Sequence, residues 1–131
     1  MAGSSTVQET VRGTARLQVF DITYTADDAT GAIDALTIAG VRDGLLVYWE
    51  HNPGATAATT AFDIVLNNEN DVDALCGGAL DIDTSANACG GPIPNGSNIT
   101  PVPVYGTLDF VATGNTQNSA TGVFTFSVIT L

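Results

Sequence analysis

The feature that most constrains this chain is an alternation of apolar and polar side chains with a period of two residues. In residues 15–25 it places Phe20, Ile22 and Tyr24 on one side of the chain, as expected of a strand with one buried face. Similar β-prone segments follow at residues 44–54, 61–67, 100–113 and 122–131, separated by turns rich in Gly, Asn and Asp. Residues 32–40 are expected to form either a strand or a short mixed element. No segment carries an apolar stripe of helical period longer than one turn. The sequence therefore predicts an all-β antiparallel β-sandwich or a barrel-like fold of the jelly-roll or immunoglobulin-like kind.

The length of 131 residues suits one domain with one hydrophobic core. The first residues are small and polar, so we expect a flexible N-terminal arm over residues 1–12 and a single β-domain over residues 13–131. Residues 100–113 and 122–131 are expected to pair as a terminal hairpin. The predicted core consists of Phe20, Tyr24, Trp49, Phe62, Ile64, Leu108, Phe110 and either Phe124 or Phe126.

The charge is strongly one-sided, with 14 acidic residues, three arginines and a net charge of −11. Nucleic acid and anionic membranes are therefore not expected as partners, because both require clustered basic residues. The acidic surface fits either a solubility role or a basic partner protein. The sequence shows neither a signal-peptide pattern nor an apolar run of transmembrane length, so we expect synthesis in a cytoplasm.

An acidic segment after residue 67 holds two Asp-x-Asp pairs, Asp71 with Asp73 and Asp81 with Asp83. Calcium prefers several such oxygen ligands, and "DIDTSAN" resembles the first half of an EF-hand loop. It lacks the glycine at the sixth position, and Pro92 stands where the closing glutamate belongs. We therefore predict a polar hairpin tip with no bound metal.

Cys76 and Cys89 each precede two glycines, which allow the backbone to bend toward a disulfide bond. In the chain-entropy model a loop of this length would contribute roughly 3 kcal/mol. Cytoplasmic synthesis disfavours the bond, whereas a particle that leaves the cell could oxidise later. We predict that the two cysteines are close and bridged in the mature particle. Their spacing fits neither a zinc site nor a redox motif.

No enzyme motif is recognisable, and we expect neither catalysis nor a cofactor. His51, the only histidine, directly precedes an Asn-Pro-Gly turn, where a capping or solvated histidine is more common than a general base. The glycine-rich turns are not followed by a lysine, so they do not indicate a phosphate site. Tyr48, Trp49 and Tyr105 could form a sugar-binding platform, but packing is the preferred interpretation.

Several phrases taken together resemble a group of small proteins encoded by tailed bacteriophages. They are "NPGATAAT", "FDIVLNNENDVDALCGGAL", "DTSAN" and "PVPVYGTLDFVATGNTQNSATGVFTFSV". In that group a strand of the type "YDIVLND" leads into "DGVDVLGGAL" and an "RDT"-like loop, and the chain ends in a "GxLTLxVxNxGxxxxGxVxxxV" hairpin. The resemblance covers roughly residues 44–131. It departs at Asn70, where an acid-glycine turn is expected, and at both cysteines.

The resemblance implies a virion structural protein, preferably a capsid decoration (cement) protein that stabilises the head. Alternatives are a tail or head–tail junction protein, or a carbohydrate-binding host-adhesion module. The implied partners are the major capsid protein and neighbouring copies of the chain, in an oligomer on the particle. We expect contacts through strand edges and through the N-terminal arm, at Val7, Val11, Arg12 and Arg16.

Overall fold

The computed structural model describes residues 6–96 and 98–130, and these residues contain strands and loops but no helix. The strands are β1 (Thr6–Gly13), β2 (Leu17–Thr25), β3 (Leu36–Pro53), β4 (Asp63–Asn67), β5 (Ala88–Gly90), β6 (Val102–Thr113) and β7 (Thr121–Thr130). Every pairing is antiparallel. The prediction of an all-β antiparallel chain is confirmed.

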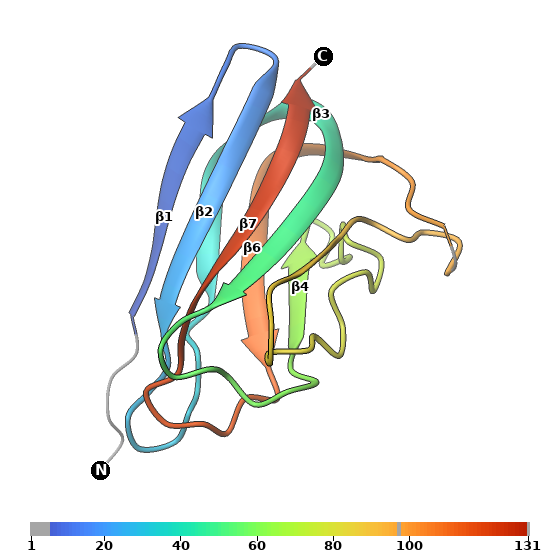
Figure 1. Cartoon of the computed structure of the whole chain (residues 1–131). Coiled ribbons are helices and arrows are strands. Elements are labelled where there is room, and N and C mark those ends of the chain that lie inside the picture. The colour runs from blue at the N-terminus through green and yellow to red at the C-terminus, as the bar shows by residue number, and fades with distance from the viewer. Residues whose placement is uncertain (1–5, 97, 131) are drawn as a thin grey trace.

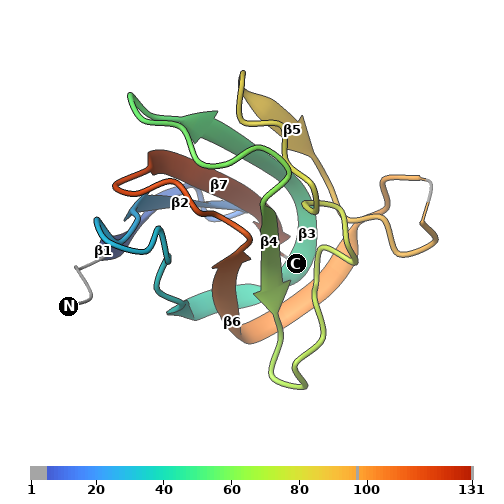
Figure 2. The ribbon, with the colours of Figure 1, turned by 90° about the horizontal axis from the view of Figure 1, so that it is seen from below.

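All seven strands belong to one sheet in the order β1-β2-β7-β3-β6-β4, with β5 added beside β3 (Figure 1). Seen along the sheet (Figure 2), the strands follow an arc, so the sheet curls into an open half-barrel. The barrel-like alternative is thus closer to the observed fold than a sandwich of two packed sheets. The described residues form a single layer whose concave side is filled by side chains and loops.

The concave side holds the core, in which aromatic rings from neighbouring strands meet. Phe20 of β2 pairs with Phe126 of β7, and their rings stack with centroids 4.7 Å apart. Loop residues around β4 complete the core from the open side: Ala58, Ala74, Leu75, Ala79 and Ile82. The predicted core is confirmed, since every residue named for it is buried and both Phe124 and Phe126 belong to it.

Strand β3 joins parts of two segments that were expected to be separate: residues 32–40, as a strand or a short mixed element, and residues 44–54, as a strand. Its first part pairs with β6 and its second part with β7, and the register shifts around Val41 mark where the strand bends. At the crossing, Gly44 is paired on both sides, with Val104 and with Thr130. A Cβ atom there would collide with the backbone of Ile129, so this position requires glycine.

The predicted terminal hairpin is wrong. β6 and β7 do not pair, because β3 lies between them in the sheet. The segment that joins them crosses the end of the half-barrel instead, and its last residue bonds to the loop after β2, from the Ala26 amide to the Ala120 carbonyl. β7 thereby pairs with β2 on one side and with β3 on the other.

The prediction of a flexible arm over residues 1–12 also needs correction. Residues 6–13 form β1, which pairs with β2 from Thr6 opposite Thr25 to Gly13 opposite Gln18. Val7 contributes to this arrangement because its side chain packs against the core. The sheet therefore begins at residue 6 rather than at residue 13, and residues 1–5 lie outside the described part of the chain.

Candidate functional site

The two edges of the sheet differ in how their backbone is covered. β1 pairs with β2 on one side, and among the described residues no segment pairs with its other side. A strand in this position presents a row of N–H and C=O groups to which another strand can add. Val11 on this strand is 49% exposed, which leaves an apolar side chain beside the free backbone.

The opposite edge, β4, is covered by the acidic segment that follows it. The amides of Ile64 and Leu66 donate to the Ala79 carbonyl and to Asp73 Oδ1, and the Leu66 carbonyl accepts from the Ala74 amide. Because these groups are already satisfied, β4 offers little to an incoming strand. Of the two ends of the strand order, β1 is therefore the one whose outer backbone no described segment covers.

Asp73 organises the covering segment. Its Oδ1 accepts from the amides of Leu66 and Leu75, both at 3.0 Å, and its Oδ2 accepts from Gly77 at 2.9 Å. Such a carboxylate fixes a loop by replacing backbone partners.

Asp83 has a similar role, since its Oδ1 accepts from the hydroxyl and the amide of Ser85, and these bonds lower its pKa. Asp71 and Asp81 lie at exposed positions with positive φ, 59° and 54°, which aspartate tolerates better than most residues. No group of three or more His, Cys, Asp or Glu residues among those described could hold a metal ion. The observed role of Asp73 and Asp83 is to accept hydrogen bonds within the loop.

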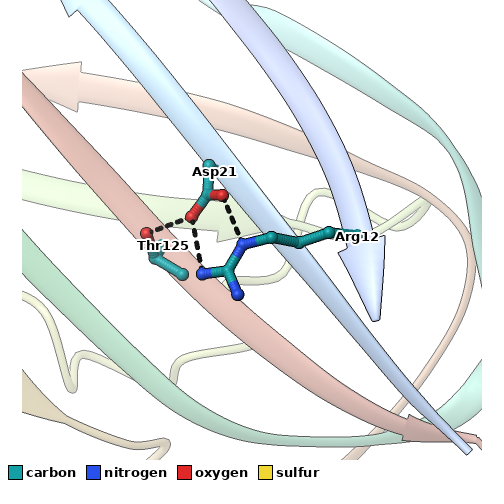
Figure 3. Close-up of polar contacts among 3 residues, drawn as sticks. All are labelled: Arg12, Asp21 and Thr125. Atoms are coloured by element: carbon teal, nitrogen blue, oxygen red, sulfur yellow. Dashed lines mark hydrogen bonds and ion pairs between the residues drawn. The ribbon is translucent and has the colours of Figure 1, made fainter. Parts of the chain in front are cut away.

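Arg12, one of the four residues predicted to contact a partner, is engaged within the chain (Figure 3). Its Nε lies 2.7 Å from Asp21 Oδ2, and Asp21 Oδ1 also accepts from the Thr125 hydroxyl at 2.7 Å. The hydrogen bond from Arg12 lowers the pKa of Asp21, and the same bond raises the pKa of Arg12. This contact ties β1 across β2 to β7 on the convex face of the sheet.

The other predicted contact residues divide into two kinds. Val7 is half-buried against the core, so it stabilises the fold from within. Val11 and Arg16 are exposed, and the described residues provide no ion-pair partner for Arg16. Of the four, Val11 and Arg16 are thus the ones available to a partner.

Arg42, which the sequence reasoning did not single out, lies at the same end of the molecule. Its guanidinium donates to the carbonyls of Thr14 and Ala15 in the turn between β1 and β2, at 3.2 and 3.3 Å. The bend of β3 therefore brings this arginine beside Arg16, although the two are far apart in the sequence. All three arginines of the chain gather at the β1–β2 turn.

A row of apolar side chains crosses the convex face next to these arginines, and it was also missed. Leu17 of β2 lies opposite Ile129 of β7, which lies opposite Leu45 of β3. Leu17 is 37% exposed and Ile129 is 43% exposed. Tyr48 is exposed further along β3, beside Ser127. Alternation places this row on the face opposite the core. Large apolar residues at positions where alternation predicts polar ones were therefore the sequence signal that could have revealed the row.

The two cysteines are free thiols in the structure, with Cys76 half-buried and Cys89 exposed. Burial raises the pKa of Cys76, and the nearby Asp73 raises it further. Cys89 lies on β5 opposite Glu50. The predicted bridge is not formed here, and its formation in an oxidising environment stays a prediction.

His51 differs from the expected capping or solvated histidine, because it is fully buried. Its Nε2 lies 2.7 Å from the Tyr24 hydroxyl, and its Nδ1 has no hydrogen-bond partner among the described residues. Burial lowers the pKa of His51 to about 4 and raises the pKa of Tyr24. The pair lies inside the core, where the rings of His51 and Phe62 meet edge to face. It forms part of the packing rather than an accessible site.

Two further features bear on ligand binding. A shallow cavity of 280 Å³ lies between residues 30–33 and 112–115, and its lining contains no ionisable side chain. Of the suggested aromatic platform, Trp49 is buried while Tyr48 and Tyr105 are exposed. No ring contact among the described residues joins the two tyrosines. A sugar platform of all three rings is therefore not formed.

No protein-family model, curated protein or solved structure matches the chain. The described part of the chain has no helix of sufficient length and apolarity to cross a membrane.

Proposed function

We propose that this chain is a structural protein of a tailed-bacteriophage virion, and that it decorates the capsid as a cement protein. The observation that supports this most is the contrast between the two ends of the strand order, since β4 is covered by its own loop while no described segment covers β1. An edge of this kind can add a strand from a neighbour, in which case main-chain hydrogen bonds supply much of the affinity. The proposal gives the major capsid protein and adjacent copies of the chain as partners, in a virion whose proteins are made in the host cytoplasm.

A tail or head–tail junction protein is the second member of the same class, and it would use the same free edge. The ratio of this protein to the major capsid protein, measured on purified particles, distinguishes a cement protein from a junction protein. The ratio should be much lower for a junction protein, because a junction occupies one vertex only. A carbohydrate-binding module is less favoured because Trp49 is buried. A relation to jelly-roll or immunoglobulin-like domains stays part of the proposal.

The edge can be tested by proline substitution at neighbouring positions of β1. In an antiparallel pair, successive residues point their N–H groups alternately toward and away from the partner strand. Of Thr10→Pro and Val11→Pro, one therefore removes a bond to β2 and the other removes an outward donor. We expect the outward variant to keep its thermal midpoint and to lose binding in co-sedimentation with capsids that lack the protein.

The inward variant serves as the matched control, because it should lower the thermal midpoint. Deleting residues 2–5 tests separately whether the segment before β1 contributes. Capsid binding that stays at the wild-type level in the outward variant would remove the edge from the proposal. Failure of the full chain to co-sediment at all would overturn the cement function.

A further inference from the structure

The connections that follow β2 and β6 meet at one end of the half-barrel, at the lower end of Figure 1, and the cavity of 280 Å³ lies between them. Its lining consists of residues 30–33 and 112–115. The gap is closed at both ends: Leu36 pairs with Phe110 at one end, and Asn115 Nδ2 donates to the Gly31 carbonyl at 2.7 Å at the other. Because the two segments are joined on either side of the gap, a partner strand cannot run along it. Only a short group that enters from outside can reach it.

The orientation of the β6 backbone follows from its pairing with β4. The amides of Ile64 and Leu66 donate to the covering segment, so they point away from β6. Successive residues of an antiparallel pair point their N–H and C=O groups alternately toward and away from the partner strand. Val65 therefore points toward β6, and its partner Val111 points toward β4. The N–H and C=O groups of Ala112, the next residue, consequently point to the other side, where the cavity lies.

These two groups of Ala112 have no partner among the residues that the structure describes. The ladder between β6 and β3 ends at Phe110 opposite Leu36, and no described loop residue bonds to the Ala112 backbone. The segment across the gap is engaged in its own turn, since the Ala32 carbonyl accepts from the Asp27 amide. Ala112 is buried, and buried backbone donors and acceptors normally have partners. The cavity thus presents one donor and one acceptor side by side.

We propose that this cavity binds a primary carboxamide, whose oxygen accepts from the Ala112 N–H and whose NH₂ group donates to the Ala112 carbonyl. A carboxamide carries an acceptor and a donor on adjacent atoms, as this pair of backbone groups requires. A carboxylate would repel the carbonyl, and an ammonium group could not accept from the N–H. The lining contains no ionisable side chain that would neutralise either charge, so burying a charge there costs free energy. Ala32 and Ile33 offer apolar surface to the rest of the ligand.

The chain itself uses carboxamides in this way where regular strand pairing stops. At the bend of β3, Gln18 Nε2 donates to the Gly40 carbonyl and Gln18 Oε1 accepts from the Arg42 amide, both at 2.9 Å. In the loop after β6, Asn115 likewise bonds to backbone groups through both its Nδ2 and its Oδ1. The proposed ligand would satisfy the backbone of Ala112 as Gln18 satisfies the backbone at the bend.

The size of the cavity indicates a small ligand, because pockets for drug-sized molecules begin at about 300 Å³. The carboxamide can belong to a free small molecule or to a glutamine or asparagine side chain of a partner, and the experiment below distinguishes these sources. None of the residues involved belongs to β1. The inference therefore does not rest on the proposed function.

The unpaired N–H can be tested first in the free protein, by amide hydrogen exchange followed by NMR. The amides of Phe110 and Val111 point to β3 and to β4 respectively, where each has a strand partner, so both should exchange slowly. The Ala112 amide should exchange at least about tenfold faster than either. Equal protection of all three amides would show that Ala112 already has an acceptor and would overturn the inference.

The probe for binding is propionamide, added to the purified full-length chain while the backbone amide signals are recorded. We expect saturable shifts at Ala112 and at residues 30–33, with a Kd in the millimolar range because the ligand has few atoms. Propionate and propylammonium are of similar size but carry a charge, so they should bind at least about tenfold more weakly. Equal binding of propionate and propionamide would overturn the inference.

Two blocked tripeptides, acetyl-Gly-Gln-Gly-amide and acetyl-Gly-Glu-Gly-amide, test a partner side chain as the source of the carboxamide. Binding of the glutamine peptide but not of propionamide would assign the site to a partner side chain, and binding of propionamide alone would assign it to a free ligand. Saturable binding of both supports the carboxamide site for either source. Saturable binding of neither would overturn it.

Ala32→Leu and Ala35→Leu form a matched pair of variants. Both alanines are exposed in the segment between β2 and β3, so both variants should keep the wild-type melting temperature, but only Ala32 lines the cavity. The larger side chain at position 32 should fill part of the cavity and raise the Kd for propionamide at least about tenfold. Ala35→Leu should bind propionamide as the wild type does. Equal affinities of the two variants would remove the cavity as the binding site.

Discussion

His51 provides a pH dependence of stability that can be worked out from the structure. The ring is fully buried, its Nε2 contacts the Tyr24 hydroxyl at 2.7 Å, and no described carboxylate reaches its Nδ1. Burial lowers the pKa of His51 to about 4, because the charged imidazolium would lose its hydration inside the core. In the unfolded chain the ordinary pKa of histidine is about 6.5.

The sign follows from proton binding in the two states. Between about pH 4 and pH 6.5 the unfolded chain binds a proton at His51 and the folded chain does not, so the free energy of unfolding rises with pH. The contribution is fully present above pH 6.5 and is lost as the pH falls toward 4. At about 1.4 kcal/mol per pH unit, the loss reaches roughly 2 kcal/mol by pH 5.

The carboxylates contribute in a different range of pH. Hydrogen bonds lower the pKa of Asp21 and of Asp83 below the ordinary aspartate value, so their contributions are lost only in more acidic solution than the interval that concerns His51. Since the chain has one histidine, a comparison of the wild type with a variant at position 51 separates its contribution from those of the other side chains. The effect can therefore be assigned to one residue.

The assay is urea unfolding at pH 7, 6 and 5 at constant ionic strength, on the wild type and on His51→Gln. Glutamine places its amide nitrogen near the former Nε2, can keep the bond to Tyr24, and does not titrate. The wild type should lose about 2 kcal/mol more than the variant between pH 7 and pH 5. Parallel losses in both proteins would refute the reasoning. A wild-type NMR titration, in which the ring signals should stay in the neutral form down to pH 5, gives a check that does not depend on the variant.

Three further predictions concern the core, the loop beside β4 and the thiols. Phe62→Ala should lower the free energy of unfolding by about 3–5 kcal/mol, because a fully buried ring is lost, and a loss below about 1 kcal/mol in a reversible melt would contradict this. Asp73→Ala should cost about 2–4 kcal/mol in the same assay, because three amides lose their acceptor, and it should cost more than Asp73→Asn, which can keep part of the bonding. Under oxidising conditions Cys76 and Cys89 should yield a linked peptide pair in mass spectrometry after non-reducing digestion, whereas two freely alkylated thiols would exclude the bridge.

Local alternation was enough to identify most strands and the core, because burial of one face leaves a two-residue period in the sequence. Phe20, Phe62 and Phe110 were predicted to be buried on this ground, and they are. Which strands pair with one another could not be predicted in the same way. Whether residues 100–113 pair with residues 122–131 or with β3 depends on contacts between distant segments, and nothing within either segment specifies them.

The error over residues 6–12 has a related cause. "TVQETVRG" carries apolar side chains only at Val7 and Val11, so its alternation is too weak to distinguish a strand from an arm. What stabilises it as a strand is outside the segment: the backbone of β2, the core that Val7 contacts, and the carboxylate of Asp21 that receives Arg12. A prediction from the local pattern alone could not include these interactions with other segments of the chain.

The exposed apolar row and the arginines beside the β1–β2 turn could also not be predicted as a group from the sequence. Leu17 and Ile129 fall on the alternate face from Phe20 and Phe126, so exposed apolar residues could be read from the sequence one strand at a time. Their meeting requires the β2–β7 register, which sets them directly opposite one another. The approach of Arg42 requires the bend of β3 and its bonds to the β1–β2 turn. Arginines and apolar residues that are scattered in the sequence thus come together only through pairings between distant strands.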